Sequence, residues 1–331
     1  MNDIENGEKF AIWHNSIGGM VDETCKTPFY TKFFWNILSE LQSEIKKRLD
    51  KGYIDLQVNF PERESFYNDS DPLGLFNQVF HQYKINADND SKWKKLKFIF
   101  MLDEFTGIYE QITKGLIPAS FMKNLKAFLE KDYFRVVLAG NDIMPKFMEK
   151  FANEFAFMYP ERIAYISKEE AKKLIDNPIK IGGENGESRY KENAIEEVLK
   201  WTACSPYYIQ WFCKRLVDYM NKNKAKFVTP ADIDNVKNEM MPELFIEDFH
   251  NLLDPGIGLN LCGEMLKVLK EIALRSKNEA CQRKSILCQT NTPLIEILGD
   301  LVRRDVLKKE RGEHYKICVG LFSEWLRNTV E

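Results

Sequence analysis

Residues 98–105 read FIFMLDEF, an apolar run that ends in two adjacent acids, Asp103 and Glu104. The run begins at Leu96 and is broken only by Lys97, which is typical of a strand buried in a parallel sheet. We therefore predict a strand that delivers both carboxylates to its carboxyl end. Successive side chains of a strand point in opposite directions, so the two acids can serve different jobs. The alternative is a strand end whose acids cap the next helix or stay in solvent.

A second predicted strand, residues 135–139, reads RVVLA and is followed by Gly140 and Asn141. The carboxyl ends of neighbouring parallel strands meet at one edge of a sheet, where α/β proteins place their ligands. Asn141 would then lie near Asp103 and Glu104 and could reach a group bound between the strand ends. The alternative is that Gly140-Asn141 is only a turn, since both residues adopt left-handed conformations readily.

The first half of the chain alternates strands with helices, a pattern that predicts an α/β fold with a parallel sheet over residues 1–166. Residues 61–72 read as a loop, with Asp71 as the N-cap of a following helix. The other expected elements are a strand at 10–13, a helix from Phe29 to the cations before Gly52, helices at 72–83 and 119–131, and a short strand at 163–166 in the same sheet.

After Ser167 the pattern changes to helices. Ser167 and Glu170 form a capping-box signature, and the expected helices span 168–176, 190–202, 206–222 and 230–240. Residues 253–259 read as a linker. Three further helices and a β-hairpin, at 306–309 and 315–319, follow in the order of a winged helix. The predicted domains are therefore an α/β core (1–166), a helical lid (167–252) and a winged helix (253–331).

The composition excludes several classes of protein. The 47 basic and 50 acidic residues give a net charge of −3, so no global field attracts nucleic acid or a membrane. The amino-terminal stretch is polar, unlike a secretory signal, and no apolar run reaches the roughly 18 residues of a membrane span. The seven cysteines form no CxxC pair, and we expect them to be reduced and mostly buried in a cytoplasmic protein.

The order of these blocks resembles the STAND branch of the AAA-related P-loop ATPases, in particular its bacterial and archaeal ATP-binding proteins. FIFMLDEF is similar to the family's Walker B strand, and RVVLAGND (135–142) to its sensor strand. Residues 34–41, 162–179 and 202–221 resemble the helix after the second strand, a later strand and helix, and the lid segment. The winged helix completes the family's domain order, so the resemblance covers nearly the whole chain.

This resemblance implies ATP and Mg²⁺ as cofactors. Asp103 would hold Mg²⁺ through its water shell, Glu104 would polarise the water that attacks the γ-phosphate, and Asn141 would sense that phosphate. The lid proline, Pro206, would approach the nucleotide, and Arg162 could contact a phosphate, although an ordinary surface role is an equal alternative. The family's activity is a nucleotide-dependent switch with slow ATP hydrolysis.

Two departures from the family pattern change this expectation. The lid segment of the family reads Thr-Gly-Gly-His-Pro, with a glycine two residues before the proline, where this chain has Cys204 before Ser205-Pro206. The phosphate-binding GxxxxGK[ST] loop (Walker A) occurs nowhere in the 331 residues. We therefore expect an incomplete P-loop core that does not hydrolyse ATP alone and leaves strand edges unpaired. A fragment of a longer protein, or a partner chain that fills the gap, would both explain this.

The rival hypothesis is a non-enzymatic regulator on a degenerate ATPase scaffold that binds DNA or a protein partner. Arg303, Arg304, Lys308 and Lys309 lie near the predicted wing and could contact DNA. In the family this domain more often packs on the ATPase core as a switch element. The aromatic residues of the lid helix (Tyr207, Tyr208, Trp211 and Phe212) fit a helix core better than a base-stacking platform.

Overall fold

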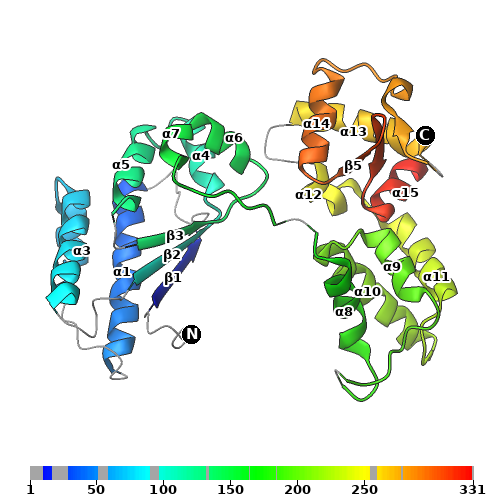
Figure 1. Cartoon of the computed structure of the whole chain (residues 1–331), viewed down its shortest axis with the longest axis horizontal. Helices are drawn as coiled ribbons and strands as arrows, with labels where there is room; N and C mark the ends of the chain where they lie inside the picture. The colour runs from blue at the N-terminus through cyan, green and yellow to red at the C-terminus, as the bar shows by residue number, and fades with distance from the viewer. Residues whose placement is uncertain are drawn as a thin grey trace. The chain divides into compact units, whose positions relative to one another are not determined.

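The computed structural model of the protein describes residues 10–16, 29–50, 59–89, 97–131, 134–163, 165–183, 185–253, 259–276 and 279–329. The chain divides into two compact units, Met1–Tyr159 and Pro160–Glu331 (Figure 1). The finer division with limits at residues 166 and 252 stays a prediction. Gly52, which was expected to follow the first helix, Cys25 and most of the predicted linker lie outside the described residues.

A three-stranded parallel sheet forms the centre of the first unit. Its strands are β1 (Phe10–Ser16), β2 (Lys97–Asp103) and β3 (Phe134–Leu138), in the order β1-β2-β3. The register aligns Ser16 with Asp103 and Leu102 with Leu138. All three strands coincide with apolar runs that predict buried strands, so the predicted α/β class is confirmed.

The core of this unit lies on one face of the sheet, beneath α1 (Phe29–Asp50), α3 (Pro72–Asn89) and α5 (Ser120–Leu129) (Figure 1). Phe100 and Leu102 of β2 are 2% exposed on this face. Phe128 packs against Phe76 with ring centroids 4.7 Å apart and against Phe100 at 6.2 Å. Interlocked aromatic rings of this kind add to the stabilisation from buried apolar area.

The caps and loops that the sequence predicts for the first unit agree with the structure only in part. Asp71 caps α3 as expected, since its Oδ1 accepts a hydrogen bond from Gly74 N–H at 2.9 Å. The predicted loop at 61–72 is wrong in its first half, because α2 (Arg63–Asn68) forms there around the fully buried Phe66, which packs on Trp35 at 5.5 Å. Three short helices were not expected from the sequence: α4 (Thr106–Thr113), α6 (Met144–Lys150) and α7 (Ala152–Phe155).

The second unit is mainly helical, as the sequence predicts. Ser167 caps α8, because its side chain accepts from Glu170 N–H at 3.2 Å. The helices are α8 (Lys168–Asp176), α9 (Ala194–Thr202), α10 (Pro206–Lys222), α11 (Pro230–Met240), α12 (His250–Leu253), α13 (Leu259–Arg275), α14 (Leu294–Arg303) and α15 (Gly320–Asn328), with short 3₁₀ turns η1 (Asn177–Ile179), η2 (Met241–Glu243), η3 (Ile246–Phe249) and η4 (Arg283–Ser285).

A small antiparallel sheet accompanies these helices. Its order is β4 (Cys281–Gln282), β6 (His314–Ile317) and β5 (Leu307–Glu310), and β5 and β6 form the predicted hairpin. One continuous core joins this sheet to the helices on both sides of residue 252. Phe249 of η3 stacks on Tyr208 of α10 at 6.0 Å and packs against Phe322 of α15 at 4.8 Å. The second unit therefore behaves as one packed body.

The expected strand at 163–166 is not formed by the described residues of that segment. Ile163, Tyr165 and Ile166 have no strand pairing, and Ala164 lies outside the described residues. Ile166 N–H donates to Cys204 O at 3.2 Å, while Tyr165 and Ile166 pack on the core of the second unit. An apolar run can be satisfied by a helical core as well as by a sheet; here Tyr165 and Ile166 join the helical core, whereas Ile163 is exposed.

A buried arginine braces the second unit. The Arg304 side chain has no exposed area and lies at the end of α14. Its Nη2 donates to Leu252 O of α12 at 3.0 Å, its Nη1 lies 3.7 Å from Met265 Sδ of α13, and Asp300 Oδ2 lies 3.6 Å from Nη1. One guanidinium therefore links three helices.

We expect Arg304→Ala to lower the free energy of unfolding by about 3–5 kcal/mol, because it removes one partner of a buried charge network. Arg303→Ala is the matched control, since this neighbour pairs with the same Asp300 from an exposed position and its loss costs less than about 1 kcal/mol. Urea denaturation followed by circular dichroism measures both. Equal effects of the two substitutions would contradict the bracing role.

Candidate functional site

Two acids occupy the carboxyl end of β2. Asp103 is the last residue of the strand, Glu104 follows it, and both side chains are exposed. Glu104 N–H donates to Asp103 Oδ1 at 2.8 Å, which fixes one oxygen of that carboxylate. Glu104 has a φ of 54°, a left-handed conformation that costs a non-glycine residue roughly 1 kcal/mol or more. Such backbone strain is concentrated at functional sites, which favours a role for this turn.

The ends of β2 and β3 are joined by hydrogen bonds beyond the last paired residues. Ala139 N–H donates to Leu102 O, and Phe105 N–H donates to Ala139 O, both at 2.8 Å. The structure therefore brings Asp103, Glu104 and Asn141 to the same edge of the sheet. This is the juxtaposition that the two sequence motifs predict.

Asn141 shapes the turn that it occupies. Its Oδ1 accepts from Ile143 N–H at 3.0 Å, and its own N–H donates to Thr106 Oγ1 at 3.4 Å. A Cβ on Gly140 would lie 2.7 Å from Thr106 Cγ2, so only glycine allows this close approach. Gly140 and Asn141 therefore do form a turn, as the alternative interpretation holds. A sensing role for Asn141 is compatible with it and stays a prediction.

Asp103 and Glu104 together form what we call the acidic tip of β2. Their carboxylates suit Mg²⁺ but do not by themselves suit a nucleotide. Carboxylate oxygens are the ligands that Mg²⁺ prefers, and one or two carboxylates with water are a usual set. Within the described part of the chain, no three His, Cys, Asp or Glu side chains gather as a closed metal site. A nucleotide also needs a phosphate cradle, and the sequence holds no GxxxxGK[ST] loop. The residues present fit the metal and leave the triphosphate without a binding loop.

The lid residues named by the sequence lie in the second unit. Pro206 is the first residue of α10, preceded by the buried Ser205. Ala203 and Cys204, at the positions of the family's two glycines, have φ values of 54° and 60°. The backbone thus keeps a turn that favours glycine, although this chain carries side chains there. Burial raises the pKa of the Cys204 thiol, which keeps it protonated.

Arg162 and the lid aromatics have partners within the second unit. Arg162 Nε donates to Asp305 Oδ2 at 2.9 Å, and Asp305 O accepts from Tyr165 OH at 2.9 Å. Tyr208 is fully buried while Tyr207 is 54% exposed, so the aromatic residues of α10 are partly core and partly surface. The nucleotide roles of Arg162 and Pro206 stay predictions.

The candidate DNA-contacting residues separate into two groups. Arg304 is buried, so the hypothesis that it contacts DNA is wrong. Arg303 forms an ion pair with Asp300. Lys308 and Lys309 are exposed on β5 and remain available. The six described cysteines are free thiols; only Cys281 is fully buried, and the others are partly buried.

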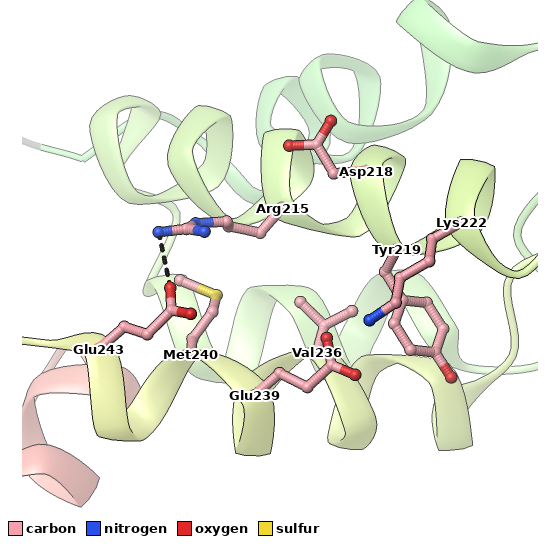
Figure 2. A pocket seen from close by; sticks show the side chains of 8 residues that line it. All are labelled: Arg215, Asp218, Tyr219, Lys222, Val236, Glu239, Met240 and Glu243. Atoms are coloured by element: carbon pink, nitrogen blue, oxygen red, sulfur yellow. Dashed lines mark ion pairs between the residues drawn. The ribbon is translucent and has the colours of Figure 1, made fainter.

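A polar groove between α10 and α11 was not anticipated from the sequence (Figure 2). Arg215 of α10 reaches across it to Glu243 of η2, with Nη2 and Oε2 3.1 Å apart. Tyr219 lies at the other end of the groove (Figure 2), and its OH accepts from Asn235 Nδ2 at 3.0 Å. Side chains of both charges line the groove, and its known contacts join neighbouring helices. We interpret the groove as part of the packing interface between α10 and α11.

No helix among the described residues has the length and apolarity of a membrane span. No protein-family model matches the sequence, and a search of curated proteins gives no match. A search of solved structures gives several.

The chain superposes on a Walker-type ATPase of Pyrococcus abyssi with a TM-score of 0.51 and 16% identity, over 97% of this chain and 85% of that one. RuvB of Thermotoga maritima, a Holliday junction branch migration motor, gives 0.36 and 11% over 94% and 84%. ORC2 of Aeropyrum pernix, solved in ADPNP–ADP complexes, gives 0.36 and 9% over 97% and 79%. The last two scores are too low to carry an argument. The first shows that the chain has the fold of a P-loop ATPase.

We expect Ala203→Gly to raise the free energy of unfolding by roughly 0.5–1 kcal/mol, because glycine relieves the left-handed backbone at this position. The same change at Ala231, exposed in the first turn of α11, should lower the free energy of unfolding by up to about 1 kcal/mol. Urea denaturation monitored by tryptophan fluorescence measures the sign of the change in the free energy of unfolding for both substitutions. Two substitutions of the same sign would contradict the conformation described for the Ala203 turn.

Proposed function

We propose that the chain is a nucleotide-dependent switch protein of the STAND type whose own residues supply the metal and water-activating half of the site. The observation that carries this proposal is the acidic tip: Asp103 and Glu104 project from a buried parallel strand, next to the Asn141 turn. The left-handed backbone of Glu104 turns the chain sharply after Asp103 and leaves both acids exposed at the strand end. The shared fold with a Walker-type ATPase is consistent with this proposal.

The two acids would divide the work. Asp103 has one oxygen held by Glu104 N–H, so its second oxygen is positioned to hold Mg²⁺ through water. Glu104 extends beyond the strand end and would polarise the attacking water, while Asn141 would respond to the γ-phosphate. Bound Mg²⁺ would neutralise charge on the phosphates. Without a phosphate-binding loop, we expect the chain to be deficient in nucleotide binding on its own.

The second unit would be the moving part of the switch. Its helices up to α12 would form the lid, and the order α13, β4, α14, β5, β6 and α15 fits a winged helix. The continuous core joining these parts supports movement as one body. Pro206 and Arg162 would meet the nucleotide in the closed state, which requires Arg162 to leave Asp305.

The rival function, a DNA- or protein-binding regulator on a degenerate scaffold, rests on the exposed Lys308 and Lys309 of β5. The burial of Arg304 removes one of its four cations, and Arg303 is paired. Binding through two lysines alone would be weak, because few phosphates would be neutralised. We therefore favour a protein partner over DNA.

We expect calorimetry of the purified chain with ATP and Mg²⁺ to show no binding tighter than about 1 mM, and no ATP turnover. The reason is the absent GxxxxGK[ST] loop, which would normally supply most phosphate contacts. Magnesium-dependent turnover that is lost in Asp103→Asn but kept in the surface control Glu130→Gln would show that the phosphate site is built in another way.

Metal binding can be tested without nucleotide. We expect Mn²⁺, which takes the same oxygen ligands as Mg²⁺, to broaden the backbone amide signals of Asp103, Glu104 and Phe105 in nuclear magnetic resonance spectra. Asp103→Asn should abolish this broadening, while Glu130→Gln should leave it unchanged. Uniform broadening over all exposed acids would argue against a metal-binding role for the tip.

A further inference from the structure

A short turn of the second unit exposes two neighbouring apolar side chains. Phe245 immediately precedes η3 and Ile246 begins it, and the two residues are 65% and 40% exposed. Phenylalanine and isoleucine are among the residues most often buried. Single exposed apolar residues are common on protein surfaces, whereas contiguous ones mark interaction sites. We call Phe245 and Ile246 together the η3 pair.

Buried neighbours hold the η3 pair in place. Leu244 and Phe249, which lie on either side of it in the sequence, are 6% and 0% exposed. Leu244 O accepts a hydrogen bond from Trp325 Nε1–H at 3.0 Å, and Phe249 packs against Tyr208 and Phe322. The segment is thus anchored to the core at both ends, so the exposure of the pair does not come from a loose loop.

A polar cap fixes the turn itself. Phe245 N–H donates to Asp248 Oδ2 at 2.8 Å, and Asp248 N–H donates to Phe245 O at 3.1 Å. These reciprocal hydrogen bonds close the turn while both apolar side chains stay exposed. A surface that is fixed before binding loses little conformational entropy on association, which favours affinity.

Acids surround the η3 pair. Residues 238–253 contain four acids, Glu239, Glu243, Glu247 and Asp248, and no lysine or arginine. Asp248 serves the cap, and the three glutamates are exposed. Glu243 is paired with Arg215 across the groove at 3.1 Å (Figure 2), whereas Glu239 and Glu247 have no ion-pair partner among the described residues. The apolar pair therefore lies in a negatively charged surface.

This charge decides between the possible occupants of the surface. A second copy of the chain would place Glu247 against the same acids, and like charges at an interface cost affinity. Nucleic acids and anionic membranes would be repelled for the same reason. A partner that offers apolar side chains next to cations satisfies both the η3 pair and the unpaired glutamates.

We propose that the η3 pair docks a basic amphipathic helix of a partner protein. The apolar face of that helix covers Phe245 and Ile246, and lysine or arginine side chains beside this face pair with Glu239 and Glu247. Acids flank the apolar pair on both sides in the sequence, as cations flank the apolar stripe of such a helix. The inference goes beyond the proposed nucleotide switch and does not depend on it.

The test titrates the full chain with a synthetic peptide of leucine and lysine, about 14 residues long, whose leucines form one stripe of a helix. Calorimetry at about 50 mM salt should give a Kd below about 100 µM. Phe245→Ser should weaken binding at least about tenfold, because it removes apolar contact area. Glu247→Lys should weaken it at least about tenfold as well, because it sets like charges against each other.

Two matched controls lie elsewhere in the second unit. Leu287→Ser replaces an apolar residue that is 70% exposed, and Glu310→Lys reverses an exposed acid on β5. Both should change the Kd by less than about twofold, since neither residue belongs to the proposed surface. Circular dichroism of all four variants checks that they are folded.

The other outcomes overturn the proposal. Equal weakening by Glu247→Lys and Glu310→Lys, with no effect of Phe245→Ser, would mean that the peptide is held by the overall charge of the chain. A dimer of the chain that Phe245→Ser dissociates would assign the η3 pair to a second copy. No binding of the peptide to the folded chain would mean that this surface does not take a basic helix.

Discussion

The pairing of β2 with β3 through to their last peptide groups is the constraint on which the first unit depends. The bonds from Ala139 N–H to Leu102 O and from Phe105 N–H to Ala139 O hold both strand ends at one level. The chain must then leave β2 sharply, and Glu104 adopts a left-handed backbone to do so. The neighbouring turn must approach Thr106 closely, and Gly140 permits this because a Cβ there would collide with the threonine methyl. The sheet thus sets the backbone positions of both acids, and the hydrogen bond from Glu104 N–H to Asp103 Oδ1 adds to this.

The second unit depends on a different kind of constraint, a polar brace within an apolar core. Arg304 ties α12, α13 and α14 together, while the Tyr208–Phe249–Phe322 stack ties α10 to α15. Neither set of contacts stops at residue 252, where the sequence pattern suggests a domain limit. A buried charge network holds one arrangement of its helices strongly, because a shifted arrangement leaves a charge without its partners. Both sets of contacts therefore hold the second unit in one internal arrangement.

The sequence predicts the helices and strands whose apolar residues follow a clear local pattern. It fails where a residue is buried by elements that are distant in the sequence. The strands around Phe100 and Val136 and the long helix from Phe29 follow from apolar periodicity alone. The run at 163–166 satisfies the same rule, yet its Tyr165 and Ile166 pack on helices, because a short apolar run does not specify what covers it. From the sequence, Arg304 is expected to be a surface cation, because no neighbouring residue in the sequence indicates that three helices enclose it. Asp103, Glu104 and Asn141 are identified by their position after strands, but the left-handed turn at Glu104 has no sequence signal, as glutamate rarely adopts it.

The handedness of the sheet's connections explains why one face is left open. The chain crosses from β1 to β2 and from β2 to β3 in the same direction, and right-handed crossovers in one direction place every helix on one face. That face carries α1, α3 and α5, with Phe100 and Leu102 beneath them. The opposite face can be covered only by a connection that runs the other way or by a segment from elsewhere. The exposure of Val137 on that opposite face is therefore in keeping with the strand order and the direction of these connections among the described residues.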